Sequence, residues 1–354
     1  MITKYGKTIL FSVAASVAVI PSAVYADTSH PHYGVVDTLR LPGAVRWDFL
    51  TFDPDHHRLF ITRGESVDVF DVTTKKTTGS ISRTSGVHGV ALAPELGRGF
   101  TSNGSSNDAT VFDLTTLQPI ATIPTGTKPD TIVYDAMTQR IFTANAGSGD
   151  LTVIDAKQSS VLNTVKLDGK PEFAVVDGKG HLYVNLEDTS QMDVVDTKDP
   201  KVVARFELAP SCDGPTGLSI DQKLNRLFVT CHNKKMLVVD AGSGKIIDAL
   251  PIGGFSDATI FDPGTNLAFS SNSDGTLDII AASGPNRYAV IQTAKTLPLA
   301  RTMALDPTTH HIYLVTAETD GFDPPTPERP HPRPRMKADS FMILTASPDD
   351  KTTK

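Results

Sequence analysis

The sequence lacks most of the short motifs from which a catalytic site is usually recognised. It contains only two cysteines, Cys212 and Cys231, and a single tryptophan, Trp47, in 354 residues. No C-x-x-C-H segment is present, which excludes covalent attachment of a c-type haem. The G-x-S-x-G, H-E-x-x-H and Walker segments are also absent. The sequence therefore carries no local signature of a serine hydrolase, a zinc protease or a phosphate-binding loop.

Basic clusters and long apolar runs are also missing. Lys and Arg number 33 against 40 Asp and Glu, so the net charge is −7. This balance argues against nucleic acid and against an anionic membrane surface as partners. Beyond residue 26, no apolar stretch approaches the roughly 20 residues that a membrane-spanning helix needs. We therefore expect no membrane span.

Residues 1–26 have the pattern of a secretory signal peptide. Lys4 and Lys7 precede an apolar stretch, 8–20, that is too short to cross a bilayer, and the residues before Asp27 fit a cleavage site. The pattern predicts an exported protein, periplasmic or secreted, whose mature chain begins at Asp27.

Most of the remaining chain is one unit repeated seven times. In the copy from Gly86 to Gly126, four short apolar runs of strand length are separated by Gly, Pro, Asn and Asp. The first run of each copy ends at a marker: Asp53, Ala93, Asp135, Asp177, Asp221, Asp262 and Asp306. These markers are 40, 42, 42, 44, 41 and 44 residues apart. Four strands at this period are typical of the blades of a β-propeller.

The two ends of the repeat array predict how the ring closes. The last copy has three strands, and the unassigned run Tyr33–Leu41 resembles the fourth strand of other copies. We therefore expect a single all-β domain, 27–346, folded as a seven-bladed propeller of four-stranded blades. The N-terminal strand would complete the last blade and leave no open sheet edge there. Residues 347–354 are expected to form a disordered tail.

Two further features qualify this plan. Cys212 and Cys231 fall on the same face of the fifth blade, which favours a disulfide in an oxidising compartment. A free-thiol or soft-metal site with His232 is the alternative.

The last blade also carries a proline-rich insertion, 317–339, whose proline content predicts an extended segment unable to form a strand ladder. It is either a lid over the channel or a mobile surface loop.

The repeats resemble a known family. The segment R-I-F-T-A-N-A-G-S-G-D-L-T-V-I-D (140–155), with G-T-K-P-D (126–130) before it, is similar to the YVTN repeat of YncE-like bacterial propellers. The resemblance covers essentially the whole mature chain. It implies the seven-bladed fold and an exported protein, but it does not imply a reaction, because many relatives of this type have no assigned chemistry.

The repeat register identifies the residues that face the central channel. The innermost strand of each copy begins five positions before the marker, at Asp48, His88, Asp130, Glu172, Thr216, Asp257 and Arg301. The loops after the second strands open on the same face and carry Arg63, Asn103, Asn145, Asn185, Glu187, Asp188, His232, Asn233, Asn272, Asp274 and Glu318. We expect both sets to surround one mouth of the channel. The alternative is that the acids only cap turns and the Asn residues only permit a positive φ.

Oxygen-rich convergence of this kind suits a divalent metal ion. The candidate ligands are Asp130, Glu172, Asp257, His88 and His232. Carboxylates alone favour calcium, and the two histidines would favour zinc, copper or iron. The candidate ligand-binding residues are Asp48, Arg63, Asn103, Asp130, Asn145, Asn185, Glu187, His232, Asp257, Asn272 and Glu318.

Three functions are compatible with such a mouth. The first is a propeller, expected to be monomeric, that binds a small molecule, a metal or a cell-envelope protein. The second is a metal-dependent hydrolase or lyase, by analogy with propeller lactonases, with His88, Glu172 and Arg301 as catalytic residues. The third is a scaffold in an envelope complex. The sequence names no substrate.

Overall fold

The computed structural model describes residues 1, 30–284, 286–324, 326 and 334–349. The predicted signal peptide, 1–26, lies outside this range except for its first residue, and so do residues 350–354 of the predicted tail. From Pro31 onward the described chain consists of β-strands joined by turns, with one short 3-10 turn, η1 (Pro94–Leu96). In that part of the chain no helix is long and apolar enough to cross a membrane.

The repeats fold into antiparallel four-stranded sheets that follow one another along the chain. Blade 1 contains β2 (Leu50–Asp53), β3 (Arg58–Thr62), β4 (Val67–Asp71) and β5 (Lys76–Ile81). Blade 2 contains β6 (Val87–Ala93), β7 (Arg98–Asn103), β8 (Asp108–Asp113) and β9 (Pro119–Pro124). Blade 3 contains β10 (Pro129–Asp135), β11 (Arg140–Asn145), β12 (Asp150–Asp155) and β13 (Ser160–Lys166).

The second half of the chain repeats the same order. Blade 4 contains β14 (Pro171–Val176), β15 (His181–Leu186), β16 (Gln191–Asp196) and β17 (Lys201–Glu207). Blade 5 contains β18 (Pro215–Asp221), β19 (Arg226–Cys231), β20 (Lys235–Asp240) and β21 (Ile246–Pro251). Blade 6 contains β22 (Ser256–Asp262), β23 (Leu267–Asn272), β24 (Thr276–Gly284) and β25 (Arg287–Lys295).

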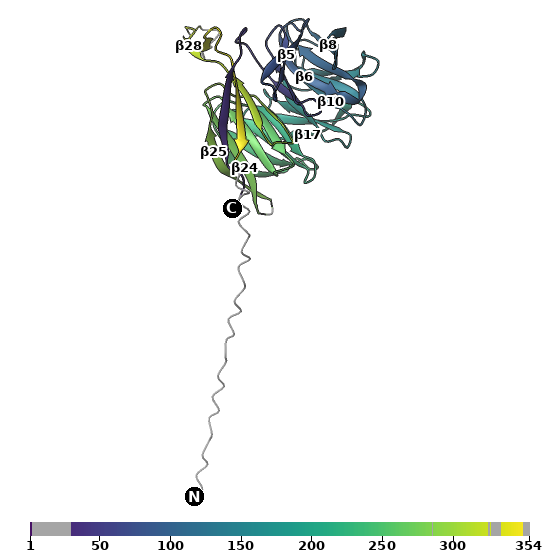
Figure 1. Cartoon of the computed structure of the whole chain (residues 1–354). Coiled ribbons are helices and arrows are strands. Elements are labelled where there is room, and N and C mark those ends of the chain that lie inside the picture. The colour runs from purple at the N-terminus through teal and green to yellow at the C-terminus, as the bar shows by residue number, and fades with distance from the viewer. Residues whose placement is uncertain (2–29, 285, 325, 327–333, 350–354) are drawn as a thin grey trace. The chain divides into compact units, whose positions relative to one another are not determined.

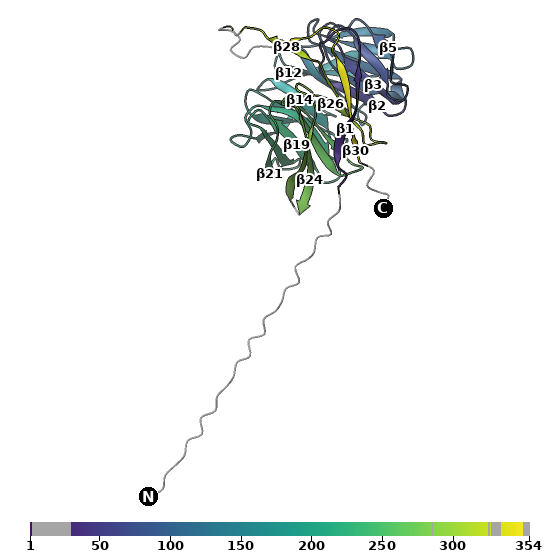
Figure 2. The ribbon, with the colours of Figure 1, turned by 60° about the vertical axis from the view of Figure 1, so that its left-hand side comes forward.

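Blade 7 is closed by the N-terminal strand, as predicted. Its sheet order is β26 (Met303–Leu305), β27 (Ile312–Thr316), β30 (Met342–Pro348) and β1 (Tyr33–Arg40). β1 pairs antiparallel with β30 from Tyr33 opposite Pro348 to Arg40 opposite Met342. The purple N-terminal strand and the yellow C-terminal strand lie side by side in both views (Figures 1 and 2). β30 continues to Pro348, so the first two residues of the predicted tail belong to the sheet.

The seven blades form a closed ring. The innermost strands contact one another in cyclic order: β2, β6, β10, β14, β18, β22, β26 and again β2. This cyclic contact confirms the seven-bladed propeller. A central channel lined by the first strand of every blade follows from that arrangement.

The core lies between the blades. The second strands are buried on both faces and each carries an aromatic ring near its middle, at Phe60, Phe100, Phe142, Tyr183, Phe228, Phe269 and Tyr313. The outer strands are mostly exposed, as β13 illustrates with one buried residue. Since each blade buries its faces against its two neighbours, the near-continuous apolar runs of the second and third strands reflect burial on both sides.

The recurrent aspartates of the sequence form turns. Asp135 and Asp221 are buried, and their side chains accept hydrogen bonds from backbone N–H groups two residues later at 3.2 and 2.9 Å. Asp71, the last residue of β4, behaves similarly and accepts from the N–H groups of Thr73 and Thr74. These carboxylates replace missing backbone acceptors in Asx turns.

The proline-rich insertion departs from the prediction. Its two ends pair as a short antiparallel ladder of β28 (Thr319–Phe322) and β29 (Pro334–Met336). The N–H of Lys337 then donates to the carbonyl of Glu318 at 2.8 Å. The expectation that this segment could form no ladder is therefore wrong at its ends. Pro334 lies at the first position of its strand, where the missing N–H is tolerated. Residues 325 and 327–333 lie outside the described residues.

The two cysteines form the predicted disulfide. Cys212 and Cys231 are bonded, with their Cα atoms 5.4 Å apart, and both are buried in the core between blades 4 and 5. No free cysteine remains in the chain, so the alternative free-thiol site with His232 is excluded. A buried disulfide fits a non-reducing compartment.

Candidate functional site

β-Bulges position the side chains at one mouth of the channel. In blades 2 to 6, the register between the first and second strands shifts near the start of the first strand. The shifted positions include His88, Asp130, Glu172, Thr216 and Asp257. A bulge leaves one residue out of the ladder and redirects its side chain. In a regular strand every second side chain points to the opposite face. The repeated bulge therefore explains why polar side chains from several blades converge at one mouth.

The closest group at this mouth joins three consecutive blades. Nδ1 of His88 lies 2.5 Å from Oδ2 of Asp48 and 3.5 Å from Oδ1 of Asp130. Asp48 is held from its backbone, because its N–H donates to the hydroxyl of Thr62 and its carbonyl accepts from Thr302. Among the described residues, Asp48, His88 and Asp130 form the group whose potential metal-ligand atoms all lie within 4.8 Å of one another.

A second group occupies the side of blades 4 and 5. Nζ of Lys170 lies 3.2 Å from Oε2 of Glu172 and also pairs with Glu187. Nε2 of His232 lies 3.5 Å from Oε1 of Glu187. Because burial alone would lower the pKa of Lys170, its raised pKa shows that the charges of Glu172 and Glu187 outweigh burial. Lys170 therefore remains a cation between two acids.

Blades 6 and 7 contribute a third pair. Nε of Arg301 lies 2.9 Å from Oδ2 of Asp257. The charge of Asp257 is the main cause of the raised pKa of Arg301, so the guanidinium stays charged. The side chain of Arg301 is 45% exposed, because the concave mouth is open to solvent.

The acids of the mouth are not fully balanced by these cations. Burial, followed by the charge of Asp48, raises the pKa of Asp130 to about 7. Burial, followed by the charge of Asp130, raises the pKa of Glu172 to about 8. Burial also raises the pKa of Asp257, although Arg301 opposes the shift. At Asp130, Glu172 and Asp257, burial and the charges of neighbouring acids therefore outweigh the nearby cations.

The charges of the neighbouring acids also act on the pKa of His88. Burial alone would lower its pKa, but the hydrogen bond with Asp48 and the charge of Asp130 outweigh burial and raise it. The imidazole also lies against Gly104, where a Cβ would come within 2.7 Å of Nε2. Gly104 thus leaves the space that the ring occupies.

An aromatic pair spans the channel next to this mouth. Phe49 of blade 1 and Phe173 of blade 4 meet edge to face with ring centroids 5.1 Å apart. Their blades are not neighbours in the ring, so this contact crosses the channel. The residues follow directly after Asp48 and Glu172 and form an apolar floor beneath the charged groups.

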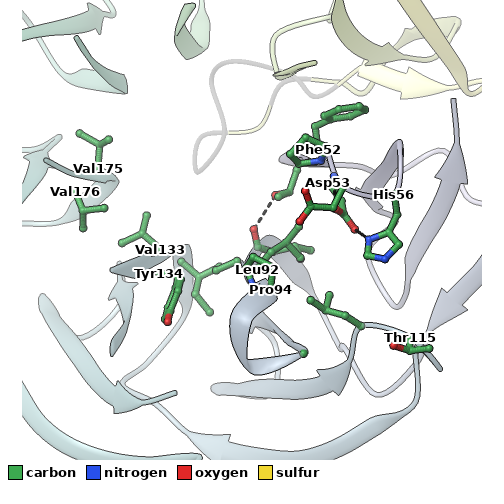
Figure 3. A pocket seen from close by; sticks show the side chains of 18 residues that line it. Phe52, Asp53, His56, Leu92, Pro94, Thr115, Val133, Tyr134, Val175 and Val176 are labelled. Atoms are coloured by element: carbon green, nitrogen blue, oxygen red, sulfur yellow. Dashed lines mark hydrogen bonds and ion pairs between the residues drawn. The ribbon is translucent and has the colours of Figure 1, made fainter. Parts of the chain in front are cut away.

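A separate apolar hollow lies toward the other ends of the same inner strands. Its volume is about 550 Å³. Phe52, Leu92, Val133 and Val175, from four consecutive blades, face it, and the ion pair of His56 with Asp53 lies at its edge (Figure 3). Its lining is mostly apolar, with Asp53, His56 and Tyr134 among the polar residues.

The charged mouth itself contains a larger cavity of about 730 Å³. Asp48, His88 and Arg301 line one part of it, and Arg46 lines another. Trp47, Leu299 and Met336 supply apolar walls. Met336 comes from β29, so the insertion of blade 7 forms part of the cavity that the innermost strands begin.

Several predicted site residues lie elsewhere. The amide groups of Asn103, Asn145 and Asn272 are buried and donate within their own blades, to Asp108 and Thr110, Asp150 and Thr152, and Thr276 and Asp278. Asn185 is buried and its Nδ2 donates to the carbonyl of Thr216, whose hydroxyl is bonded to Thr230 and Ser256, whereas Oδ1 of Asn185 has no hydrogen-bond partner among the described residues. We leave these four residues out of the proposed site because the amide N–H groups of all four bind within or between blades.

Arg63 and Glu318 also make structural contacts. The guanidinium of Arg63 is buried, lies over the ring of Phe341, and binds Asp68 at 3.2 Å. Glu318 pairs with Arg40 and Lys337 at the base of the insertion. Of the five candidate metal ligands, Asp130 and His88 belong to the close group, with Asp48 as the third member, whereas Glu172, Asp257 and His232 do not.

The sequence interpretation missed three features of the mouth: Lys170, Arg46 and the Phe49–Phe173 pair. Lys170 and Arg46 each precede a mouth residue by two positions, so the repeat register that identified the inner ring could also have found them. The aromatic pair has no comparable signal, because it depends on the distance across the channel.

Comparison with known structures supports the fold. The chain superposes with a TM-score of 0.69 on a chain titled Kuenenia stuttgartiensis hydrazine synthase, at 16% identity, covering 80% of this chain and 95% of that one. It superposes equally well, with a TM-score of 0.69 and 11% identity, on a chain of a mitotic checkpoint complex, covering 98% and 99% of the two chains. At these identities the likeness extends to the fold alone.

Sequence comparison adds no family. No protein-family model matches the chain, and no curated protein is similar to it in sequence. The seven-bladed fold that the YVTN-type repeats implied is confirmed by the structure and its neighbours. The finer resemblance to YncE-like propellers rests on the repeat motif alone, and neither sequence comparison supports it. The chain is a seven-bladed β-propeller with a His–Asp–Asp cluster at one mouth of its channel.

Proposed function

We propose that the mouth of this propeller binds a divalent transition-metal ion at Asp48, His88 and Asp130. The observation that carries the proposal is the approach of both carboxylates to the same nitrogen, Nδ1 of His88, at 2.5 and 3.5 Å. One imidazole nitrogen with two carboxylate oxygens suits zinc or another borderline cation. Calcium fits less well, because it prefers six to eight oxygen ligands.

Charge balance supports the same proposal. Asp48, Asp130, Glu172, Glu187 and Asp257 bring five carboxylates to the mouth. Arg46, Lys170 and Arg301 are the cations that line the cavity or pair with these acids, so the acids outnumber them when every acid is ionised and His88 is neutral. A divalent cation would reduce that excess. Its charge would also oppose the rise in the pKa of Asp130 that burial, followed by the charge of Asp48, causes.

The test is direct metal binding. Protein prepared without chelator or nickel affinity resin is analysed by elemental mass spectrometry, and metal-free protein is titrated with zinc by calorimetry. We expect one ion per chain, and a loss of at least about tenfold in zinc affinity in His88→Gln and in Asp130→Asn. His181→Gln is the matched control. Nδ1 of His181 in blade 4 lies 2.9 Å from Oδ2 of Asp177, so this variant also removes a histidine that is paired with an aspartate.

Two outcomes would contradict the proposal. The first is the absence of zinc binding to the wild-type protein above background. The second is equal zinc affinity in wild type, His88→Gln and Asp130→Asn, which would place the bound ion elsewhere.

A second candidate function is a metal-dependent hydrolase or lyase at the same mouth. The observation that favours it is the position of Glu172, a carboxyl outside the proposed metal ligands, 3.2 Å from Nζ of Lys170 at the same mouth; burial, followed by the charge of Asp130, raises its pKa to about 8. Acids poised near neutral pH can exchange protons with a reacting group. A bound metal ion would polarise a substrate carbonyl. Glu172 would carry the proton, and Arg301 would orient an anionic group.

The enzyme proposal is tested on a panel of lactones and aryl esters with zinc-loaded protein. Turnover that is lost in Glu172→Gln while zinc affinity is retained would support it. Turnover that persists in Glu172→Gln and His88→Gln would remove it in this form. No described surface favours the third function, a scaffold in an envelope complex.

We also infer that the protein is exported. The support is the signal-like pattern of residues 1–26, the YVTN-type repeat and the buried disulfide. The partner would then be a small molecule, or a protein, of the periplasm or the extracellular space. Fractionation of cells expressing the full chain tests this: recovery of uncleaved protein in the cytoplasm alone would contradict export.

A further inference from the structure

The rim of the charged mouth differs chemically from its interior. The residues two positions before the mouth residues are Arg46, Gly86, Lys128, Lys170, Gly214, Phe255 and Leu299. Blades 1, 3 and 4 therefore supply basic side chains, and blades 6 and 7 supply apolar ones. The acids lie one layer deeper. The rim thus has a basic arc and an apolar arc around an acidic centre.

Backbone conformation at the rim is specialised. Lys128, Phe255 and Leu299 adopt left-handed φ values of 51°, 55° and 66°, which are unfavourable for residues with a side chain. Gly86 and Gly214 have φ values of the same sign at the equivalent positions. Phe255 is nevertheless 73% exposed. The same sign of φ at five equivalent positions marks a turn that the repeats share, and Phe255 places an exposed phenyl ring on that turn in blade 6.

The cavity includes one residue of each arc, Arg46 and Leu299, beside two of the proposed metal ligands. Asp48 and His88 line it, so an ion held by them would face the open space. Arg46 lines the same cavity and is exposed, and no hydrogen bond or ion pair of its guanidinium is found among the described residues. Arg301 is already paired with Asp257 at 2.9 Å. Arg46 is thus the cation left to bind an incoming anion.

The opposite wall of the cavity is apolar. Trp47 and Leu299 contribute from the chain before blades 1 and 7, and Met336 contributes from β29 of the insertion. The volume of about 730 Å³ lies in the range of small-molecule sites. An anionic group beside Arg46 and an apolar portion against Trp47 and Met336 would satisfy both walls.

We propose that this cavity binds a small amphipathic organic anion, such as a carboxylate with an apolar chain. The carboxylate lies between Arg46 and the metal ion, and the chain lies along Trp47, Leu299 and Met336. This inference rests on the proposed metal site and specifies the class of molecule that reaches it. Arg46 supplies charge-assisted hydrogen bonds, for which the fork of a guanidinium matches a carboxylate.

The test uses Trp47 as the probe, because it is the only tryptophan of the chain and lines the cavity. Zinc-loaded protein is titrated with octanoate, 1-octanol and octylammonium while tryptophan emission is followed. We expect octanoate to change the emission with saturation, and the alcohol and the amine to bind at least about tenfold more weakly.

Two variants sharpen the result. Arg46→Gln should weaken octanoate binding by about tenfold or more and leave zinc affinity close to wild type. Arg83→Gln is the matched control, because it removes a positive charge from the loop before β6, and Arg83 does not line the cavity. The control should bind octanoate like the wild type.

Zinc affinity measured on the same samples separates the two proposals. Normal zinc binding without an octanoate response, or with equal binding of octanoate, octanol and octylammonium, would overturn the organic-anion proposal alone. Failure to bind zinc would overturn the proposed function. Octanoate affinity that is equal in metal-free and zinc-loaded protein would overturn the placement of the carboxylate on the metal.

Discussion

At the scale of single residues, the acids of the mouth govern how the protein responds to pH. Asp130 and Glu172 bind a proton more tightly in the folded chain than in the unfolded chain, because burial and mutual repulsion raise their pKa values to about 7 and about 8. Where the folded state holds more protons, stability falls as pH rises. The window for this effect runs from about pH 4 to about pH 8, between the unfolded and folded pKa values.

This linkage predicts a pH-dependent melting temperature. Metal-free protein should lose several degrees of Tm between pH 5 and pH 8. His88, whose pKa is raised, acts in the same direction above pH 6.5. The carboxylates with lowered pKa values, such as Asp113 and Asp240, act only below about pH 4. Differential scanning fluorimetry measures the effect.

Variants and zinc provide the control for this measurement. Asp130→Asn should flatten the fall in Tm, because the amide does not ionise. Excess zinc should raise the Tm of the wild type most strongly at pH 8, where the ligands are deprotonated. A Tm that is constant or rises from pH 5 to pH 8 in metal-free protein would contradict the assignment of unbalanced charge to the mouth.

Gly104 provides a second prediction at this scale. In Gly104→Ala the new Cβ would lie 2.7 Å from Nε2 of His88, so the imidazole would have to move. The φ of Gly104 is not left-handed, so alanine introduces no backbone strain. We expect zinc affinity to fall about tenfold while the Tm of metal-free protein changes by only a few degrees. Gly97→Ala is no suitable control, because Gly97 has a left-handed φ of 63°.

Gly34→Ala is the matched control, since nothing lies within 4 Å of the added Cβ. It should leave zinc affinity unchanged. Unchanged affinity in Gly104→Ala itself would show that the position of the His88 ring does not determine metal binding.

At the scale of elements, irregular strands build the site. The register shifts of β6, β10, β14, β18 and β22 occur at the mouth and nowhere else along these five strands. The same strands are regular near their other ends, where Leu92, Val133 and Val175 of β6, β10 and β14 line the apolar hollow. The bulges thus place polar side chains at one end of each inner strand, whereas the other end keeps the regular ladder.

The insertion of blade 7 carries the element-scale prediction. Since β29 lines the cavity, occupancy should slow hydrogen exchange in β28 and β29, including the amide of Lys337, which donates to Glu318. Exchange followed by mass spectrometry, with and without zinc and octanoate, measures this. The exposed outer strand β13 is the internal control and should exchange at the same rate in both conditions. Rapid exchange throughout the insertion in both conditions would contradict a lid.

At the scale of the whole molecule, two long-range contacts define the ring. β1 closes blade 7 by pairing with β30, about 300 residues away, and the Phe49–Phe173 pair crosses the channel between blades 1 and 4. The first contact removes an open sheet edge. The second joins two blades that are not neighbours in the ring.

Removal of the closing strand should therefore destabilise the whole ring. A chain that begins at residue 42 lacks β1, which exposes the edge of β30 and removes the contact of Tyr33 with Phe269, 4.9 Å between centroids. We expect a Tm at least about 10 °C lower and concentration-dependent aggregation. A chain that begins at residue 31 keeps β1 and is the control. Equal Tm values for the two chains would contradict closure by β1.

The repeat pattern in the sequence is sufficient to predict the architecture and the inner ring. Buried strands between neighbouring blades require apolar runs, and the turns between them require Asp, Asn and Gly, so local chemistry recurs at each period. That periodicity located Asp48, His88, Asp130, Glu172, Asp257 and Arg301 at one mouth. The repeats could not separate structural from exposed polar groups, as Asn103 and Arg63 illustrate, because burial depends on neighbouring blades.

Only the tertiary structure decided which of these residues act together. Asp48, His88 and Asp130 lie about 40 residues apart in sequence, and their distances follow from ring closure and from the bulges that redirect them. The raised pKa values require burial and neighbouring charges that no local pattern contains. The same is true of the aromatic floor and of Met336, which reaches the cavity from the insertion. Sequence determines the period and the chemistry of each unit, whereas contact across the ring determines the site.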